Sequence, residues 1–164
     1  MALELNIQDV IGDLARPNLF EVEISYLGEN LKFQAYAASL PASTVGKIPV
    51  GYQNRKVGYA GDRTYADWTV GIYNDEQQII RRQLIEWSEL VQNHGRTIKG
   101  GQAQEYKQTA FVRQFNRAGE KTAEFKITGI FPLEVGAVTL SWEDNDTVEK
   151  FDVQFHIDWL DPLY

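Results

Sequence analysis

Apolar and polar residues alternate along several stretches of the chain, most regularly near the C-terminus. From Phe151 to Trp159 every second residue is apolar, and the polar residues between them are Asp152, Gln154, His156 and Asp158. Shorter stretches of the same period cover residues 19–27, 68–72, 123–127 and 138–142. A period of two is typical of a strand with one buried and one solvated face. Such strands predict an antiparallel, mainly β protein.

Turn-forming residues separate the first of these stretches from a further alternation at residues 31–36. Gly28, Glu29 and Asn30 lie between the two. Alternating segments joined by a short turn are typical of a β-hairpin. We therefore expect residues 19–27 and 31–36 to pair with each other.

One segment has the period of a helix. Its apolar residues recur at spacings of four, three and four, which places on one helix face Ile80, Leu84, Trp87 and Val91. Asn74 ahead of them is typical of a helix N-cap, and Gly95 behind them is typical of a helix end. The pattern predicts one amphipathic helix over residues 75–94 that covers the sheet.

The stretch from Pro41 to Gly61 is long, holds two prolines and four glycines, and lacks a strong core pattern. Connections of this length are uncommon in compact domains unless they have a function. The apolar residues on either side of Gln53 and Asn54 suit an extended β-hairpin arm over residues 42–61. Such an arm exposes apolar side chains that one chain cannot easily bury.

Charge is distributed unevenly along the chain. The net charge is −7, which disfavours tight binding to nucleic acid. Residues 30–61 nevertheless carry four basic residues and no acidic one, whereas residues 143–164 carry seven acidic residues and one lysine. Two surfaces of opposite sign suit head-to-tail contacts between copies, which close into rings or continue as filaments. The alternative is a solvated hairpin that is neutralised by the acidic strand of its own chain.

Residues with catalytic or metal-binding chemistry are scarce. The chain of 164 residues fits one domain, residues 1–164, and contains two histidines and no cysteine. We expect no catalytic, cofactor or metal site: a hydrolase built on acid pairs such as Asp62 and Asp67 has no positive support, and Asp144 to Asp146 is interpreted as a turn. The N-terminus lacks the basic and apolar pattern of an export signal, and no apolar run reaches the length of a membrane span.

Several motifs resemble, in order and spacing, the tail tube protein of contractile-tailed, T4-like phages. They are ARPNLFEVEISYLG at residues 15–28, LPA at 40–42, KIPVG at 47–51, NRK at 54–56, AGDRTYADWTV at 60–70, NDE at 74–76 and GIFPLEVG at 129–136. The resemblance extends from about Ala15 to about Trp159. It is weakest in the first dozen residues, around 94–104 and at the C-terminal end.

The resemblance implies a β-sandwich or barrel-like subunit with one helix, assembling into hexameric rings that share a continuous inner β-barrel and stack into a hollow tube. The arm would reach a neighbouring ring. Its interface candidates are Val45, Lys47, Ile48, Val50, Tyr52, Arg55 and Lys56. The candidates for the channel wall, or for an acidic interface, are Asp152, Gln154, His156 and Asp158.

The implied role is a virion structural protein of the tail, assembled in the host cytoplasm, which forms the channel for DNA ejection and the core for a contractile sheath. The implied partners are further copies of the chain, the tail sheath protein, and the baseplate and tail terminator proteins. Tape measure protein and genomic DNA would lie in the lumen without sequence-specific binding. The resemblance implies no cofactor and no membrane binding.

Two alternatives remain open at this point. The inner tube of a contractile injection or type VI secretion system would share the architecture. A small-ligand-binding β-barrel with one covering helix would instead be a monomer with an apolar pocket, and it would leave the arm unexplained.

Overall fold

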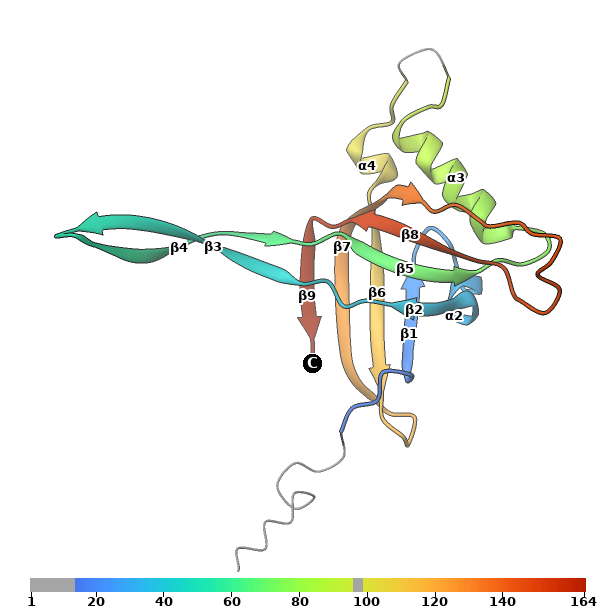
Figure 1. Ribbon diagram of the computed structural model, residues 1–164, viewed down its shortest axis with the longest axis horizontal. Helices are drawn as coiled ribbons and strands as arrows, with labels where there is room; N and C mark the ends of the chain where they lie inside the picture. The colour runs from blue at the N-terminus through green and yellow to red at the C-terminus, as the bar shows by residue number, and fades with distance from the viewer. Residues whose placement is uncertain (1–13, 96–98) are drawn as a thin grey trace, which may run out of the picture.

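A computed structural model describes residues 14–95 and 99–164 (Figure 1). The strands are β1 (Phe20–Ile24), β2 (Ala35–Ala38), β3 (Ser43–Tyr52), β4 (Arg55–Tyr65), β5 (Trp68–Tyr73), β6 (Gln108–Phe115), β7 (Lys121–Val135), β8 (Lys150–His156) and β9 (Trp159–Leu163). The helices of the described residues are α2 (Asn30–Gln34), α3 (Ile79–Val91) and α4 (Ala103–Tyr106). All strand pairs are antiparallel. The mainly β, antiparallel class is therefore confirmed.

The body of the molecule is one bent sheet. Six strands follow the order β1-β6-β7-β8-β5-β2, and a seventh, β9, pairs with β7. The long strand β7 links two halves of this sheet, because its first part pairs with β6 and its part from Phe131 onward pairs with β8. In Figure 1 the two halves run across each other. The sheet is open, with β1 and β2 at its ends, so this chain does not close a barrel by itself.

Gly129 marks the bend in β7. Its φ is 71°, a left-handed conformation that favours glycine. The pairing of β7 with β6 shifts at this point, where Gly129 is the extra residue of a bulge between Thr128 and Ile130. A side chain at Gly129 would also overlap the carboxylate of Asp158. The backbone and the space around it both require glycine at this corner.

The hydrophobic core lies between the bent sheet and α3. The C-terminal alternation is confirmed up to Ile157, since Phe151, Val153, Phe155 and Ile157 are all buried. Trp159 is 57% exposed, because β8 ends at His156 and the chain starts a new strand, β9, in the other half of the sheet. The largest fully buried side chains of the core include Trp68, Trp87, Phe155, Ile24, Leu27 and Leu31.

The amphipathic helix is present but shorter than expected. The structure forms α3 over Ile79–Val91, where the sequence predicted 75–94, and Ile80, Leu84 and Trp87 point into the core as expected. Asp75, not Asn74, accepts the hydrogen bond from the first helical N–H, at 3.0 Å from Ile79 N. Asn74 is engaged elsewhere: its side-chain amide donates to Glu149, 2.8 Å away. The expectation of a single helix is also wrong, because two short helices, α2 and α4, accompany α3.

The hairpin expected between residues 19–27 and 31–36 does not form. β1 pairs with β6, β2 pairs with β5, and the segment between them contains α2. In α2, Leu31 is buried while Lys32 lies 3.1 Å from a carboxylate oxygen of Glu21 on β1. Burial and ion pairing of this helical turn therefore replace the local strand pairing.

The strand expected at residues 138–142 is also absent. These residues belong to the connection between β7 and β8 and have no strand pairing. Leu140 is 83% exposed and Trp142 is 100% exposed. Val138, at the start of this stretch, is partly buried against the core, whereas Leu140 and Trp142 follow the period of a strand without reaching the core.

Candidate interaction surfaces

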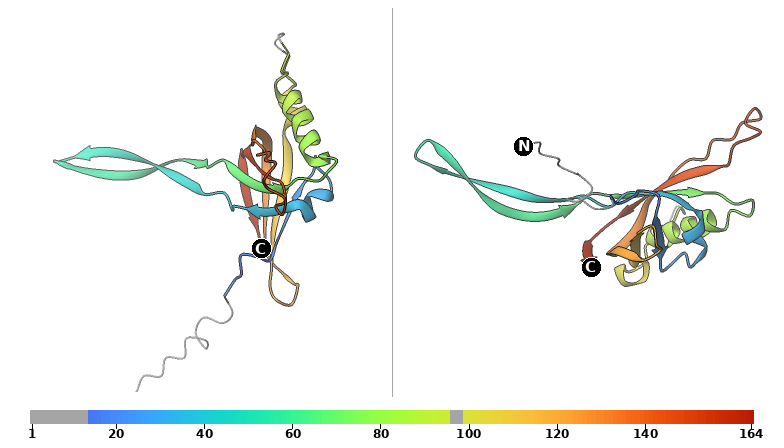
Figure 2. Two further views of the ribbon diagram at one scale, coloured as in Figure 1. Left: turned by 45° about the vertical axis from the view of Figure 1, so that its right-hand side comes forward. Right: turned by 90° about the horizontal axis from the view of Figure 1, so that it is seen from below.

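The predicted arm is the most prominent feature of the structure. β3 and β4 form a separate two-stranded sheet that projects away from the body (Figures 1 and 2). Every residue from 43 to 60 is exposed. At about 3.3 Å per residue, the ten residues of β3 span about 33 Å. The arm therefore reaches well beyond the body and contributes nothing to its core.

Local sequence explains why the arm is a hairpin. Gln53 and Asn54 both have positive φ, 45° and 63°. A two-residue turn needs positive φ at both residues for its twist to match that of the flanking strands. Nearer the body, Gly46 and Gly61 approach closely at a bulge: a Cβ on Gly61 would stand 3.2 Å from the Gly46 carbonyl carbon. Glycines at this crossing allow the two strands to twist tightly around each other.

The arm has two different faces. Ile48 pairs with Tyr59, Val50 with Val57, and Tyr52 with Arg55, so these side chains share one face. Its five apolar members, Ile48, Val50, Tyr52, Val57 and Tyr59, which we call the apolar row, are 46% to 67% exposed. Val45 pairs with Arg63 beyond the bulge and does not belong to this row. An exposed, continuous apolar row of this kind marks a contact surface.

Three of the predicted cations lie on the arm. Lys47 and Lys56 occupy the face opposite the apolar row, and Arg55 lies at the tip. Within the described parts of the chain, none of the three has a carboxylate within ion-pair distance. The fourth cation, Lys32, lies instead in the body, on α2. The acidic strand β8 pairs with β5 and β7, away from the arm, so it does not neutralise these charges.

The second predicted surface is divided into two parts. Asp152 and Gln154 lie on the exposed face of β8. His156 and Asp158 lie at the end of the strand, where His156 Nε2 is 2.9 Å from Asp158 Oδ1 and Lys107 binds the other oxygen of Asp158. The hydrogen bond from Lys107 lowers the pKa of Asp158. The four residues continue one polar alternation along and just beyond β8, but His156 and Asp158 are engaged with each other and with Lys107, whereas Asp152 and Gln154 are exposed.

Aromatic side chains next to Asp152 were not recognised in the sequence. Tyr36 on β2 donates a hydrogen bond to Asp152 at 3.2 Å, and its ring lies 4.8 Å from that of Tyr73. Lys150 Nζ lies 5.2 Å from the Tyr36 ring centre. Burial raises the pKa of the Tyr36 hydroxyl, and the hydrogen bond to Asp152 adds to this shift. Gly71 leaves room for the ring, because a Cβ there would stand 2.6 Å from Tyr36 Cζ.

A charge network crosses the outer face of the other half of the sheet. Arg113 on β6 contacts Glu23 at 2.6 Å, Glu124 at 2.9 Å and Glu21 at 3.3 Å, so it joins β1 to β7. The hydrogen bond from Arg113 holds the pKa of Glu23 below its ordinary value. No sequence signal indicated this network, because its members are distant in the chain.

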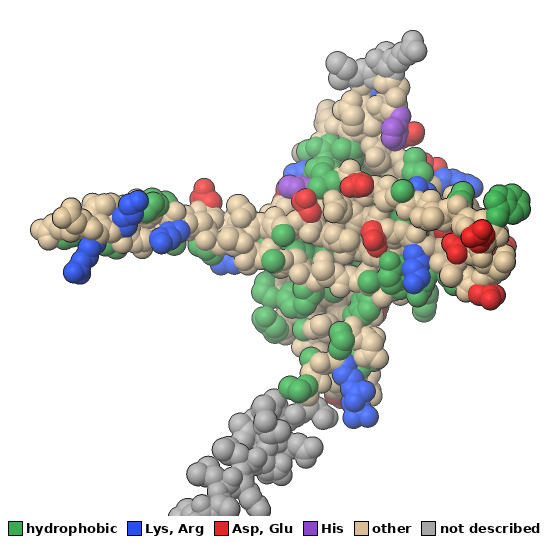
Figure 3. All heavy atoms as spheres, in the orientation of Figure 1, with side chains coloured by type: hydrophobic (Ala, Val, Ile, Leu, Met, Phe, Trp, Pro, Cys, Tyr) green, Lys and Arg blue, Asp and Glu red, His purple; other side chains and the backbone are tan. Residues whose placement is uncertain are grey.

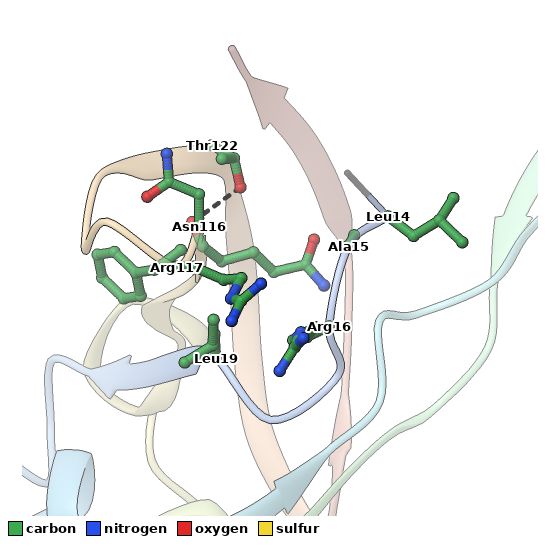
Figure 4. Close-up of a pocket in the computed structure, with 9 residues that line it drawn as sticks. Leu14, Ala15, Arg16, Leu19, Asn116, Arg117 and Thr122 are labelled. Carbon is green, nitrogen blue, oxygen red and sulfur yellow. Dashed lines mark hydrogen bonds between the residues drawn. The ribbon is translucent and has the colours of Figure 1, made fainter. Parts of the chain in front are cut away.

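One hollow lies at the foot of the sheet. A hollow of about 170 Å³ lies between the segment at Leu14 to Leu19 and the turn that joins β6 to β7 (Figure 4). Arg16 and Arg117 line it, and Thr122 donates a hydrogen bond to the Gln114 carbonyl at 3.2 Å. Among residues 14–95 and 99–164 no three His, Asp or Glu side chains are placed to hold a metal, and no helix there is long and apolar enough to cross a membrane. The prominent surfaces are therefore the arm and the outer face of the sheet.

Comparison with known proteins gives a consistent result. The sequence pattern of one family, described as phage tail tube protein, matches residues 5–159. Over 149 residues the chain is 48% identical to the tail tube protein gp19 of Enterobacteria phage T4, covering 90% of this chain and 91% of that protein. The tail tube protein gp19 of Enterobacteria phage T6 gives the same identity and coverage.

Solved structures share the fold at low sequence identity. One is a sheath-tube complex of an extracellular contractile injection system, PVC, in the extended state: its TM-score is 0.66 at 13% identity, covering 96% of this chain and 97% of that one. The sheath/tube terminator of the same system has a TM-score of 0.72 at 13% identity, covering 94% of this chain and 99% of that one. Both likenesses concern the fold.

Proposed function

This chain belongs to the phage tail tube protein family, with T4-like relatives, and we propose that six copies form a ring and that rings stack into a hollow tube. The protein is thus a structural component of the virion tail. The tube would form the channel for DNA ejection and the rigid core inside a contractile sheath. This role requires no catalytic step, and we propose that the protein is not an enzyme.

The exposed arm is the observation that carries the proposal of assembly. A two-stranded sheet with an exposed apolar row is not stable alone in water and needs a surface to cover it. A second copy in a neighbouring ring supplies that surface. Monomeric ligand-binding barrels have no use for such an arm, so this alternative lacks support.

The open sheet explains how a ring would close. Within the described residues β2 pairs with β5 alone, so its other edge is unpaired. An unpaired edge is a template for a strand of another chain. We propose that the half of the sheet formed by β2, β5 and β8 continues into that of the neighbouring copy, and that six copies close the inner barrel.

In this arrangement the exposed face with Asp152 and Gln154 would line the channel. Basic side chains bind DNA phosphates because the contact releases counterions from the DNA. A wall with few free cations would make few such contacts, so DNA could slide past it. Lys150, a cation near this face, lies over the rings of Tyr36 and Tyr73. Genomic DNA and the tape measure protein would pass this wall without sequence-specific contacts.

The outer surface of the tube would contact other tail proteins. The similar PVC chains come from a sheath-tube complex and from a sheath/tube terminator, which supports a sheath and a terminator as partners here. A baseplate would start the assembly. Identity of 48% to phage tail tubes, against 13% to the injection system, favours the phage tail over the injection or secretion tube.

Assembly of the purified protein tests this proposal. The expected result is a concentration-dependent conversion from monomer to large particles in sedimentation velocity, with hollow rods or rings of uniform width in negative stain. A protein that stays monomeric at every concentration, even when a tail baseplate is supplied as a template, would contradict it.

A further inference from the structure

The connection between β7 and β8, residues 136–149, exposes three apolar side chains, among them a tryptophan. Leu140 is 83% exposed, Trp142 is 100% exposed and Val148 is 62% exposed. We call these three the loop patch. A fully exposed tryptophan loses the favourable burial of the largest apolar side chain, so its presence points to a contact.

Acidic side chains surround the loop patch. Glu143, Asp144 and Asp146 are exposed and, within the described structure, have no cation within ion-pair distance. Glu149 differs from them, because it accepts a hydrogen bond from Asn74 that fastens the end of the connection to the body. The loop patch is therefore apolar at its centre and negatively charged around it.

The arm carries the complementary pattern. Its apolar row has five exposed members, Arg55 lies at the tip of the same face, and Lys47 and Lys56 lie on the opposite face. In Figure 1 the arm and the β7–β8 connection extend from opposite ends of the body, and Figure 3 shows basic side chains along the arm and acidic ones gathered at the other end. One chain cannot join its own two surfaces, whereas a second copy can.

We infer that the arm of one copy docks on residues 136–149 of another copy, apolar row against loop patch, with Arg55 at the tip facing the acids Glu143, Asp144 and Asp146. Lys47 and Lys56, on the other face of the arm, add to the positive charge that the acidic loop attracts. This inference rests on the proposed tube and identifies the acceptor of its arm. The contact joins two different surfaces of identical chains, so it repeats and propagates. The apolar side chains supply burial, and the charges select the register and exclude like-charged surfaces.

Complementary charge reversal tests the contact. The arm variant Lys47→Glu/Arg55→Glu/Lys56→Glu and the loop variant Glu143→Lys/Asp144→Lys/Asp146→Lys should each lose assembly when alone, at least about tenfold in the assembled fraction, since like charges then face each other. Mixed in equal amounts, they should assemble again, because each arm now meets a loop of opposite sign.

The matched control reverses three exposed acids on and beside α3, as Glu76→Lys/Glu86→Lys/Glu89→Lys. This variant keeps its own arm and loop, so it should assemble by itself. Mixed with the arm variant, it should bring much less of the arm variant into the assemblies than the loop variant does, although the change in net charge is the same. Equal rescue by both partners would overturn the inference, and so would a mixture of arm and loop variants that stays unassembled while the wild type assembles.

A cross-link gives a readout that does not depend on rod formation. The chain has no cysteine, so two can be placed at will. Val50→Cys with Leu140→Cys should yield disulfide-linked oligomers on oxidation, about tenfold more than Val50→Cys with Ile85→Cys, because a disulfide needs Cα atoms within about 7 Å. Rods that form without this cross-link would overturn the inference but not the proposal of a tube. A protein that stays monomeric and forms no rods would instead contradict the proposed function. A loop that cross-links to sheath protein instead of the arm would also overturn it.

Discussion

At the residue scale, the structure depends on a few positions where only one side chain fits. Gly129 is the clearest, because it needs a left-handed backbone and leaves no room for a Cβ beside Asp158. Nothing in the sequence distinguished it from other loop-like glycines, since the bend depends on a strand and a carboxylate that are distant in the chain. The same holds for Gly71 under the ring of Tyr36.

Gly129→Ala should therefore destabilise the fold by about 2–3 kcal/mol, the sum of backbone strain and a steric clash. Urea unfolding of the purified monomer measures this change. Gly51→Ala is the matched control: it lies on the arm, where an added methyl group would have no atom within 4 Å apart from its chain neighbours, and it should change the stability little. Equal midpoints for the two variants would contradict the assigned role of Gly129.

Arg113 gives a prediction about pH. It lowers the pKa of Glu23, so the ion pair stabilises the folded state above the unfolded pKa of Glu23 and loses its effect as pH falls through the folded value. Stability of the wild type should thus decline between about pH 5 and pH 3, and less steeply in Arg113→Gln. Urea midpoints across this range measure the difference, and parallel curves would show that the network does not contribute.

At the element scale, the alternation predicted what faces the core but not which strands pair. The spacing of apolar residues alone predicts which side chains of β8 are buried, and it also predicts the buried face of α3. The expected hairpin after Gly28 failed because β1 and β2 pair with β6 and β5, which lie far away in the sequence. The arm was predicted because its turn, Gln53 and Asn54, is local. The alternation at 138–142 predicts a strand that does not form: Val138 packs against the core, but Leu140 and Trp142 are exposed.

The arm offers an element-scale prediction. Replacing residues 47–60 with Asn-Gly should leave the body folded, because the arm buries no core residue, and the stability should change by less than about 1 kcal/mol for the shortened connection. Circular dichroism and thermal unfolding check the body, and sedimentation checks assembly, which should be lost. Assembly that persists without the arm would show that ring contacts alone suffice.

At the scale of the whole molecule, the single chain is an incomplete structure. It has an open sheet, an arm that covers nothing of its own body and an acidic loop with an exposed tryptophan at the opposite end. Opposite charge at the two ends was visible in the sequence, but their separation in space was not, because it depends on how the body lies between them. Each feature is accounted for once copies lie head to tail.

The most direct test is a cryo-EM reconstruction of the assembled protein. The proposed tube predicts sixfold rings, an inner barrel in which strands of neighbouring copies pair, and density for each arm against a different copy. Two results would contradict the proposed tube. One is an assembly in which residues 43–60 of each copy stay in solvent, and the other is a tube whose wall lacks strand pairing between copies.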